Sequence, residues 1–155
     1  MTYRAIMQID FYQIGQAGLE GTLVVLLNKT CNAGMKSLIL CPAPSAVAID
    51  DALWSHDAES WLPHGVDDAD GTGHASIWIS TDMAANPIDA AFLFLLHGSE
   101  PAKWDRFERC FCLFDGRSNA QLSQARLQWA AWRDLPDVKL GYYAQTDSGG
   151  WEKKA

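Results

Sequence analysis

Positive charge is scarce in this sequence. Its 155 residues include 12 Lys and Arg against 19 Asp and Glu, which gives a formal net charge of −7 at neutral pH. Such a surface repels phosphates, so a protein that coats DNA or RNA is disfavoured. The shortage is uneven, because residues 1–102 hold 3 basic and 12 acidic residues whereas residues 103–155 hold 9 and 7. Any anionic partner is therefore expected to meet the C-terminal third, unless these cations only solvate the surface.

Long apolar runs are also missing. No segment approaches the roughly 20 apolar residues that span a bilayer, and the start lacks the apolar stretch and cleavage site of a secretory leader. We therefore expect the protein in the cytoplasm. The four cysteines, Cys31, Cys41, Cys110 and Cys112, fall in apolar patterns and are expected to be reduced. Zinc is disfavoured, because no second Cys or His pair accompanies Cys110 and Cys112.

Phosphate-binding signatures are absent as well. The first expected strand-to-helix turn carries Gly15, Gly18 and Gly21 in the spacing Gly-x-x-Gly-x-x-Gly, and no Gly-Lys-Ser or Gly-Lys-Thr occurs. Glu20 would repel a pyrophosphate at that helix start. The serines and histidines match no nucleophile elbow or catalytic triad. We expect no cofactor, no metal and no catalytic residue, with a nucleotide-binding enzyme of Rossmann-like fold as the alternative.

Short apolar segments bounded by Gly, Pro or polar residues are the expected strands. They are residues 8–14, 37–41, 75–81, 91–96, 109–114 and 140–145. Residues 37–41 and 91–96 are almost wholly apolar, as strands covered on both faces are. Residues 65–74 are polar and rich in Gly and Asp, which predicts a loop.

Segments with apolar residues at intervals of three and four separate these strands. They are a helix that starts near Leu19 and stops at Gly34, a helix capped by Ser45 that carries Trp54, and a helix that begins at Ser118 or Asn119 and ends before Pro136. Alternating strands and helices predict an α/β fold in one domain over residues 1–155. We expect a three-layer α/β/α arrangement with a largely parallel sheet, Rossmann-like but without a nucleotide-binding loop.

The last of these helices carries the first candidate binding surface. Its apolar stripe consists of Leu122, Ala125, Trp129 and Trp132, and its adjoining face holds Arg126, Trp129 and Arg133. Trp129 thus lies where apolar and cationic residues meet, which suits a ligand with an apolar side chain next to a carboxylate. The alternative is that both tryptophans belong to the core and both arginines are only solvated.

A second candidate surface lies where the second helix is expected to end. Trp54 and Trp61 are seven residues apart, and Pro63 follows them. Tryptophans are large and rigid, so such a pair either anchors another protein or fills a corner of the core.

Several of these segments resemble the chi subunit family of the bacterial DNA polymerase III holoenzyme. The resemblance runs nearly end to end. It rests on Phe11-Tyr12, on Leu53-Trp54, on Glu59-Ser60-Trp61-Leu62-Pro63-His64-Gly65, on Phe107-Glu108-Arg109, on Phe114-Asp115-Gly116, on Ala125-Arg126 with Trp129, and on the ending Gly150-Trp151-Glu152-Lys153-Lys154-Ala155.

This resemblance implies an accessory subunit without catalysis of its own. It would bridge the clamp loader to the single-stranded-DNA-binding protein (SSB) on the lagging strand. The psi subunit, which is itself tethered to the clamp loader, would bind the surface that maps to Trp54, Trp61 and Pro63.

The resemblance also implies a pocket for the acidic C-terminal tail of SSB. That pocket maps to Arg126 and Trp129, and helical spacing adds Arg133. Ala130 stands where a lysine often follows the aromatic residue in this family, so the pocket is expected to be less cationic than usual. Contacts with a short tail should be modest in affinity and sensitive to salt.

Overall fold

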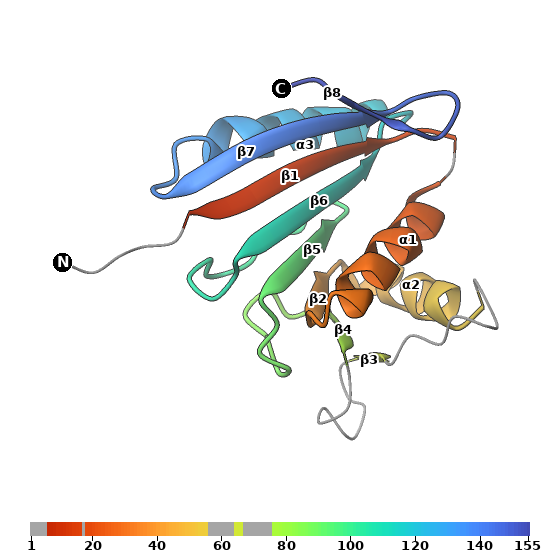
Figure 1. The fold of residues 1–155 in the computed structure, drawn as a ribbon, viewed down its shortest axis with the longest axis vertical. Coiled ribbons are helices and arrows are strands. Elements are labelled where there is room, and N and C mark those ends of the chain that lie inside the picture. Colours follow the sequence, from red (N-terminus) through yellow and green to blue (C-terminus); the bar gives the residue numbers. More distant parts are fainter. Residues whose placement is uncertain (1–5, 17, 56–63, 67–75) are drawn as a thin grey trace.

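A computed structural model describes most of the chain (Figure 1). The described residues are 6–16, 18–55, 64–66 and 76–155, with the backbone alone described for 54, 55 and 64–66. In chain order the elements are β1 (Met7–Ile14), α1 (Leu19–Asn32), β2 (Ser37–Leu40), α2 (Ala43–Ser55), β3 (His64–Val66), β4 (Ile77–Ser80), β5 (Phe92–Leu96), β6 (Arg109–Asp115), α3 (Asn119–Trp132), β7 (Val138–Gln145) and β8 (Trp151–Lys153).

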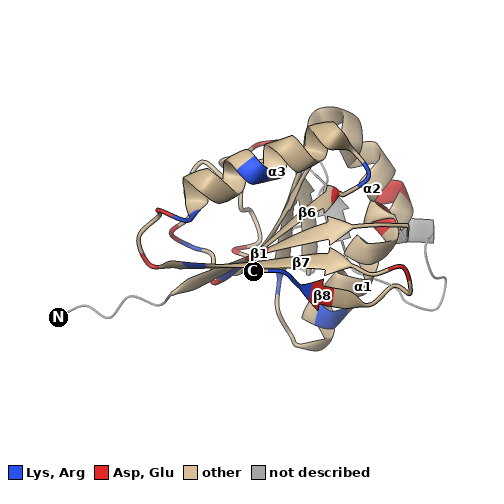
Figure 2. Cartoon of the chain, turned by 90° about the horizontal axis from the view of Figure 1, so that it is seen from above, with Lys and Arg blue, Asp and Glu red and all other residues tan. Residues whose placement is uncertain are grey.

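The strands form one sheet of eight in the order β3-β4-β2-β5-β6-β1-β7-β8. Every neighbouring pair is parallel except β7 and β8, which are antiparallel. Parallel neighbours need crossover connections, and the helices supply them. Helices α1 and α2 lie on one face of the sheet and α3 lies on the other (Figures 1 and 2). The predicted three-layer α/β/α fold is confirmed.

The alternation of side chains along the strands divides the interior into two hydrophobic cores. On β1, Ile9 and Phe11 face α3, whereas Tyr12 and Ile14 face α1 and α2. The core beneath α3, called the α3 core below, also contains Trp132. Strand β2 is buried at every position and β5 at all but the first, as their apolar sequences predict.

Helix α2 begins earlier than expected. It starts at Ala43, so Ser45 lies inside the first turn, where its N–H donates to the Pro42 carbonyl at 2.9 Å. The prediction that Ser45 caps this helix is wrong. Pro44 fits the first turn because no intrahelical N–H is required there and its φ is already helical.

A short edge strand lies where a loop was predicted. Residues 64–66 form β3, which pairs in parallel with β4 so that His64 lies opposite Ile77. Three residues are too few for a periodic pattern, and the neighbouring strand supplies the pairing. Residues 67–74 of the predicted loop lie outside the described residues.

A further strand follows the one that was expected to be the last. Strand β7 turns at Thr146, whose N–H donates to the Gly150 carbonyl at 2.8 Å, and β8 returns antiparallel along it. The three exposed residues of β8 give no apolar alternation in the sequence. This hairpin forms the edge of the sheet beside α3.

Candidate functional site

Helix α3 positions the first candidate surface. Ser118 caps the helix, and its hydroxyl accepts from the Gln121 N–H at 3.3 Å. Of the predicted apolar stripe, Ala125 is buried and Leu122 is half-buried. Gln128 is also buried, and its amide donates to the Ser99 carbonyl at 3.3 Å. A buried amide with a partner costs little, which explains why a polar residue interrupts the stripe.

Trp132 is a core residue. Its side chain is 2% exposed, and its ring centre lies 5.6 Å from that of Phe11 and 5.0 Å from that of Trp104. The indole N–H donates to Glu100 Oε1 at 3.0 Å. For this tryptophan the core alternative is therefore correct.

Trp129 lies at the boundary between the α3 core and the surface. It is half-buried, and its ring packs edge-on against Phe11 at 5.4 Å and against Tyr142 at 6.0 Å between centres. Phe11 and Tyr142 are cross-strand neighbours on β1 and β7. The rings of Phe11 and Tyr142 thus support the indole on one side, and part of the indole remains accessible.

Arg126 lies one turn before Trp129 and is exposed. Burial raises the pKa of Tyr142, and the positive charge of Arg126 opposes that shift, so the guanidinium acts on the tyrosine hydroxyl. This hydroxyl donates to Gln13 Oε1, which fixes the ring. An apolar aromatic surface and a cation therefore meet across α3 and β7. Figure 2 shows α3 lying over the sheet on this face.

Tyr142 was not predicted as part of this surface. It comes from β7, and it lies next to α3 because the crossover connection places β7 beside β1. The available signal was the alternation along residues 140–145, which puts Tyr142 on the same face as Leu140. Alternation shows on which face of the strand Tyr142 lies, but it does not show which helix packs against that face.

Arg133 occupies the other end of the surface. It is the C-cap residue of α3, is exposed, and its N–H donates to the Trp129 carbonyl at 3.0 Å. Seven residues along a helix correspond to about 10 Å between Arg126 and Arg133. The two arginines thus lie on either side of Trp129 along the helix axis.

The second candidate surface cannot be placed in the same way. Trp54 belongs to the last turn of α2, but its side chain lies outside the described residues. Trp61 and Pro63 also lie outside them. The prediction for this surface stays a prediction.

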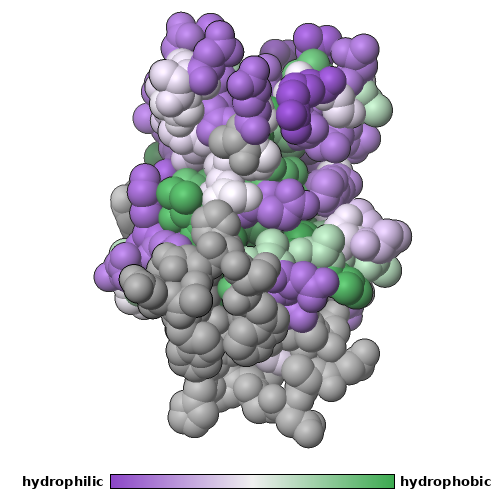
Figure 3. Space-filling view, turned by 90° about the vertical axis from the view of Figure 1, so that its right-hand side faces the viewer, coloured by the Kyte–Doolittle hydropathy of each residue, from purple (hydrophilic) through white to green (hydrophobic). Residues whose placement is uncertain are grey.

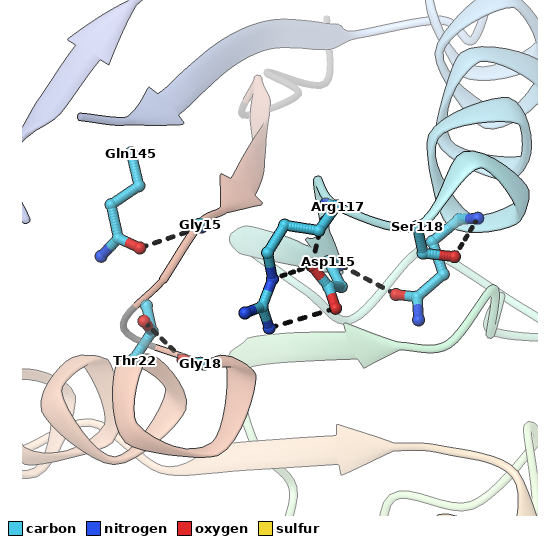
Figure 4. Close-up of polar contacts among 8 residues, drawn as sticks. Gly15, Gly18, Thr22, Asp115, Arg117, Ser118 and Gln145 are labelled. Atoms are coloured by element: carbon cyan, nitrogen blue, oxygen red, sulfur yellow. Dashed lines mark hydrogen bonds and ion pairs between the residues drawn. The ribbon is translucent and has the colours of Figure 1, made fainter. Parts of the chain in front are cut away.

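The carboxyl ends of β1, β6 and β7 form the side of the molecule seen in Figure 3, where hydrophilic side chains border a band of apolar ones. Open α/β sheets bind nucleotides at such an edge. Here several backbone N–H groups donate to side chains of the chain itself (Figure 4). The pairs are Gly15 with Gln145 Oε1 (3.0 Å), Asp115 with Gln121 Oε1 (2.8 Å), Arg117 with Asp115 Oδ1 (2.9 Å) and Gln121 with Ser118 Oγ (3.3 Å). These donors are therefore already used within the chain.

The first turn of α1 at the same edge is also unsuited to a phosphate. Gly18 precedes the helix with φ 83°, and Glu20 lies exposed in the first turn. A carboxylate there repels a phosphate at the helix N-terminus. This described turn is therefore a poor phosphate site.

Cys110 and Cys112 both face the α3 core. Burial raises the pKa of both thiols, that of Cys112 to about 12, and the Cys112 thiol contacts Gln128 Oε1 at 3.6 Å. Thiols of this kind are protonated at neutral pH and behave as small apolar groups. The described part of the chain contains no group of three or more His, Cys, Asp or Glu arranged to hold a metal ion.

Comparison with known proteins identifies the family. The family model described as DNA polymerase III chi subunit, HolC, matches residues 6–136, which is most of the chain. No curated protein gives a significant match. Among the described residues, none of the helices is long and apolar enough to cross a membrane. The matched region contains all of α3 and ends before β7. On this match the chain belongs to the DNA polymerase III chi subunit family.

Proposed function

We propose that this protein is a non-catalytic accessory subunit of DNA polymerase III that bridges the psi subunit and the acidic C-terminal tail of SSB during replication. Family membership supports the coarser part, a subunit of DNA polymerase III. The observation that carries the finer part is the half-buried Trp129 on Tyr142, with the charge of Arg126 beside it.

An acidic peptide tail that ends in an apolar residue needs three features in its receptor. These are an apolar slot, a cation for a carboxylate and a surrounding positive potential. The ring of Trp129, packed on Phe11 and Tyr142, supplies the apolar slot, and Arg126 supplies the cation. The C-terminal third of the chain, with its excess of basic residues, supplies the third. A guanidinium can pair with a carboxylate through two parallel hydrogen bonds, which gives direction as well as attraction.

Isothermal titration calorimetry with a synthetic SSB tail peptide tests this surface. We expect Arg126→Glu to abolish measurable binding, because the substitution replaces attraction by repulsion at an exposed position. Lys36→Glu is the matched control, since it makes the same change of charge at an exposed position next to α1 and β2, away from α3. Unchanged binding by Arg126→Glu would refute the assignment.

The psi surface needs a separate test. We expect Trp54→Ala combined with Trp61→Ala to weaken association with the psi subunit in size-exclusion chromatography while the tail peptide still binds. If the double variant instead loses its circular dichroism signal, the tryptophans belong to the core and this surface is wrongly assigned.

A nucleotide-binding enzyme remains the alternative function. At its expected site, the carboxyl edge of the sheet, the backbone N–H groups of Gly15, Asp115 and Gln121 are engaged with side chains of the chain itself. A thermal-shift screen with nucleotides distinguishes the two functions, because a ligand that binds the folded state raises its melting temperature. We expect no shift.

A further inference from the structure

The end of the chain adds a cation to the surface around Trp129. Strand β8 runs antiparallel to β7 with Lys153 opposite Tyr143. The next two residues both oppose Tyr142, because the N–H groups of Lys154 and Ala155 donate to its carbonyl at 2.8 and 3.4 Å and its own N–H donates to the Ala155 carbonyl at 3.1 Å. Two residues opposite one is the pattern of a β-bulge, which redirects side chains at the edge of a sheet.

Alternation through β8 and the residue after it sends Lys153 and Lys154 to opposite faces of the sheet. Lys153 shares a face with Tyr143, which packs against the core under α1 and α2. Lys154 shares a face with Tyr142, which packs in the α3 core. An ion pair between Lys154 Nζ and Glu152 Oε2 at 3.2 Å confirms that these two side chains lie on the same face. Lys154 is therefore the cross-strand neighbour of the tyrosine that supports Trp129.

We infer that Lys154 is a further cationic contact for the acidic tail, beside those of α3, on the side of Tyr142 opposite to β1. The inference rests on the proposed function, since it concerns the same surface. Arg126 and Trp129 would receive the end of the peptide, and Lys154 would receive an acidic side chain next to it. The family match ends at residue 136, so it assigns no role to this residue. The chain has Ala130 directly after Trp129, so a cation from the residue that follows β8 adds charge that α3 itself does not provide there.

The pair with Glu152 is compatible with this role. Its two side chains are 50% and 61% exposed, and exposed ion pairs contribute little to stability. Lys154 can thus exchange the carboxylate of Glu152 for one from a peptide at small cost. Glu152 acts as a competitor that weakens the binding of an acidic tail.

The closing experiment measures the affinity of the SSB tail peptide for full-length variants by calorimetry. Lys154→Gln should raise the Kd roughly threefold, as expected for one exposed charge contact. Lys153→Gln is the matched control, because it removes the same charge one residue away on the other face of the sheet, and its Kd should stay within about 1.5-fold of the original protein. Lys154→Arg should keep the original affinity, because it keeps the positive charge. If Lys154 acted only through the packing of its aliphatic stem, the changed side chain would not be expected to preserve the affinity.

Glu152→Gln provides a test of opposite sign. It should lower the Kd by up to about threefold, because it removes the competing carboxylate without removing a cation. Equal affinities of Lys154→Gln and Lys153→Gln, in a protein that still binds the peptide through Arg126, would overturn the role of Lys154 alone. If the unmodified protein fails to bind the peptide, or Arg126→Glu has no effect, the proposed function fails and this inference fails with it.

Discussion

The two faces of the β1–β7 strand pair use aromatic residues for different purposes. On the α3 face, Phe11 and Tyr142 lie beneath a helix and support the half-buried Trp129. On the opposite face, Tyr12 stacks on Tyr143 with 5.4 Å between ring centres. Tyr143 also packs at the margin of the core under α1 and α2. The two faces of this strand pair therefore differ. The aromatic residues support a candidate binding surface on one face and stack on each other on the opposite face.

Polar residues show the difference most clearly. On the face away from α3, Asp10 is 2% exposed, and it accepts from Gln8 Nε2 at 2.7 Å and from Arg109 Nη2 at 3.1 Å. Its charge is paired within the chain, as a buried carboxylate requires. On the α3 face Arg126 is exposed and Lys154 has only an exposed partner. Cations that are accessible in this way are suited to an external carboxylate.

The largest expected effect comes from Trp132. Trp132→Ala should lower the free energy of unfolding by about 3–5 kcal/mol, because it leaves a cavity between Phe11 and Trp104 and leaves the carboxylate of Glu100 without its donor. Urea denaturation followed by circular dichroism measures it. A loss below about 1 kcal/mol would contradict the division of α3 into a core tryptophan and a surface tryptophan.

A smaller effect is expected at Gly141 on the other face. A Cβ at this position would lie 2.4 Å from Asp10 Oδ1, so Gly141→Ala must displace the carboxylate that Arg109 holds. We expect a loss of roughly 1–3 kcal/mol in the free energy of unfolding. Gly15→Ala is the control, since its Cβ would meet its nearest neighbour at an ordinary 3.6 Å. If the clash is the cause, combining Gly141→Ala with Asp10→Ala should cost less than the sum of the two single changes.

Trp129 should affect binding more than stability. Trp129→Ala should cost on the order of 1–2 kcal/mol in the free energy of unfolding, since the indole is only half-buried, and it should remove measurable binding of the tail peptide. Denaturation and calorimetry on the same preparation separate the two effects. A variant as unstable as Trp132→Ala would mean that both tryptophans serve the core.

Alkaline pH gives the smallest expected difference. Burial and the charge of Asp10 raise the pKa of Tyr12 to about 12, against the opposing charge of Arg109. The folded protein thus holds this proton more tightly than the unfolded chain, so the stabilisation is complete below pH 10 and is lost as the pH rises toward 12. Tyr12→Phe lacks this titration, and its melting temperature should fall less steeply over that range. Parallel curves for the two proteins would show that Tyr12 does not ionise differently on folding.

Much of the architecture follows from local sequence patterns. The apolar runs of β2 and β5, the leucine spacing of α1 and the start of α3 at Asn119 each depend on neighbours in sequence, and each was predicted correctly. The position of Trp129 between apolar and cationic residues was also readable, because one helix carries all of the residues concerned. Its role in binding a partner stays a prediction.

Other features depended on contacts between distant segments. The short strands β3 and β8 form because they pair with β4 and β7. Three residues are too few to show a strand pattern in the sequence. Helix α2 starts at Ala43, before Ser45, which was the expected cap. This start depends on how Pro44 fits the first turn.

The sequence by itself determined the class of fold, the family and a tryptophan next to an arginine on the last helix, because helical and strand periodicities are local. The tertiary structure alone decided that Trp132 is core while Trp129 reaches the surface, that Tyr142 lies beneath the latter, and that Lys154 shares its face. Sheet order and strand register set these neighbourhoods. They arise from hydrogen bonds between strands far apart in the chain, which no local pattern contains.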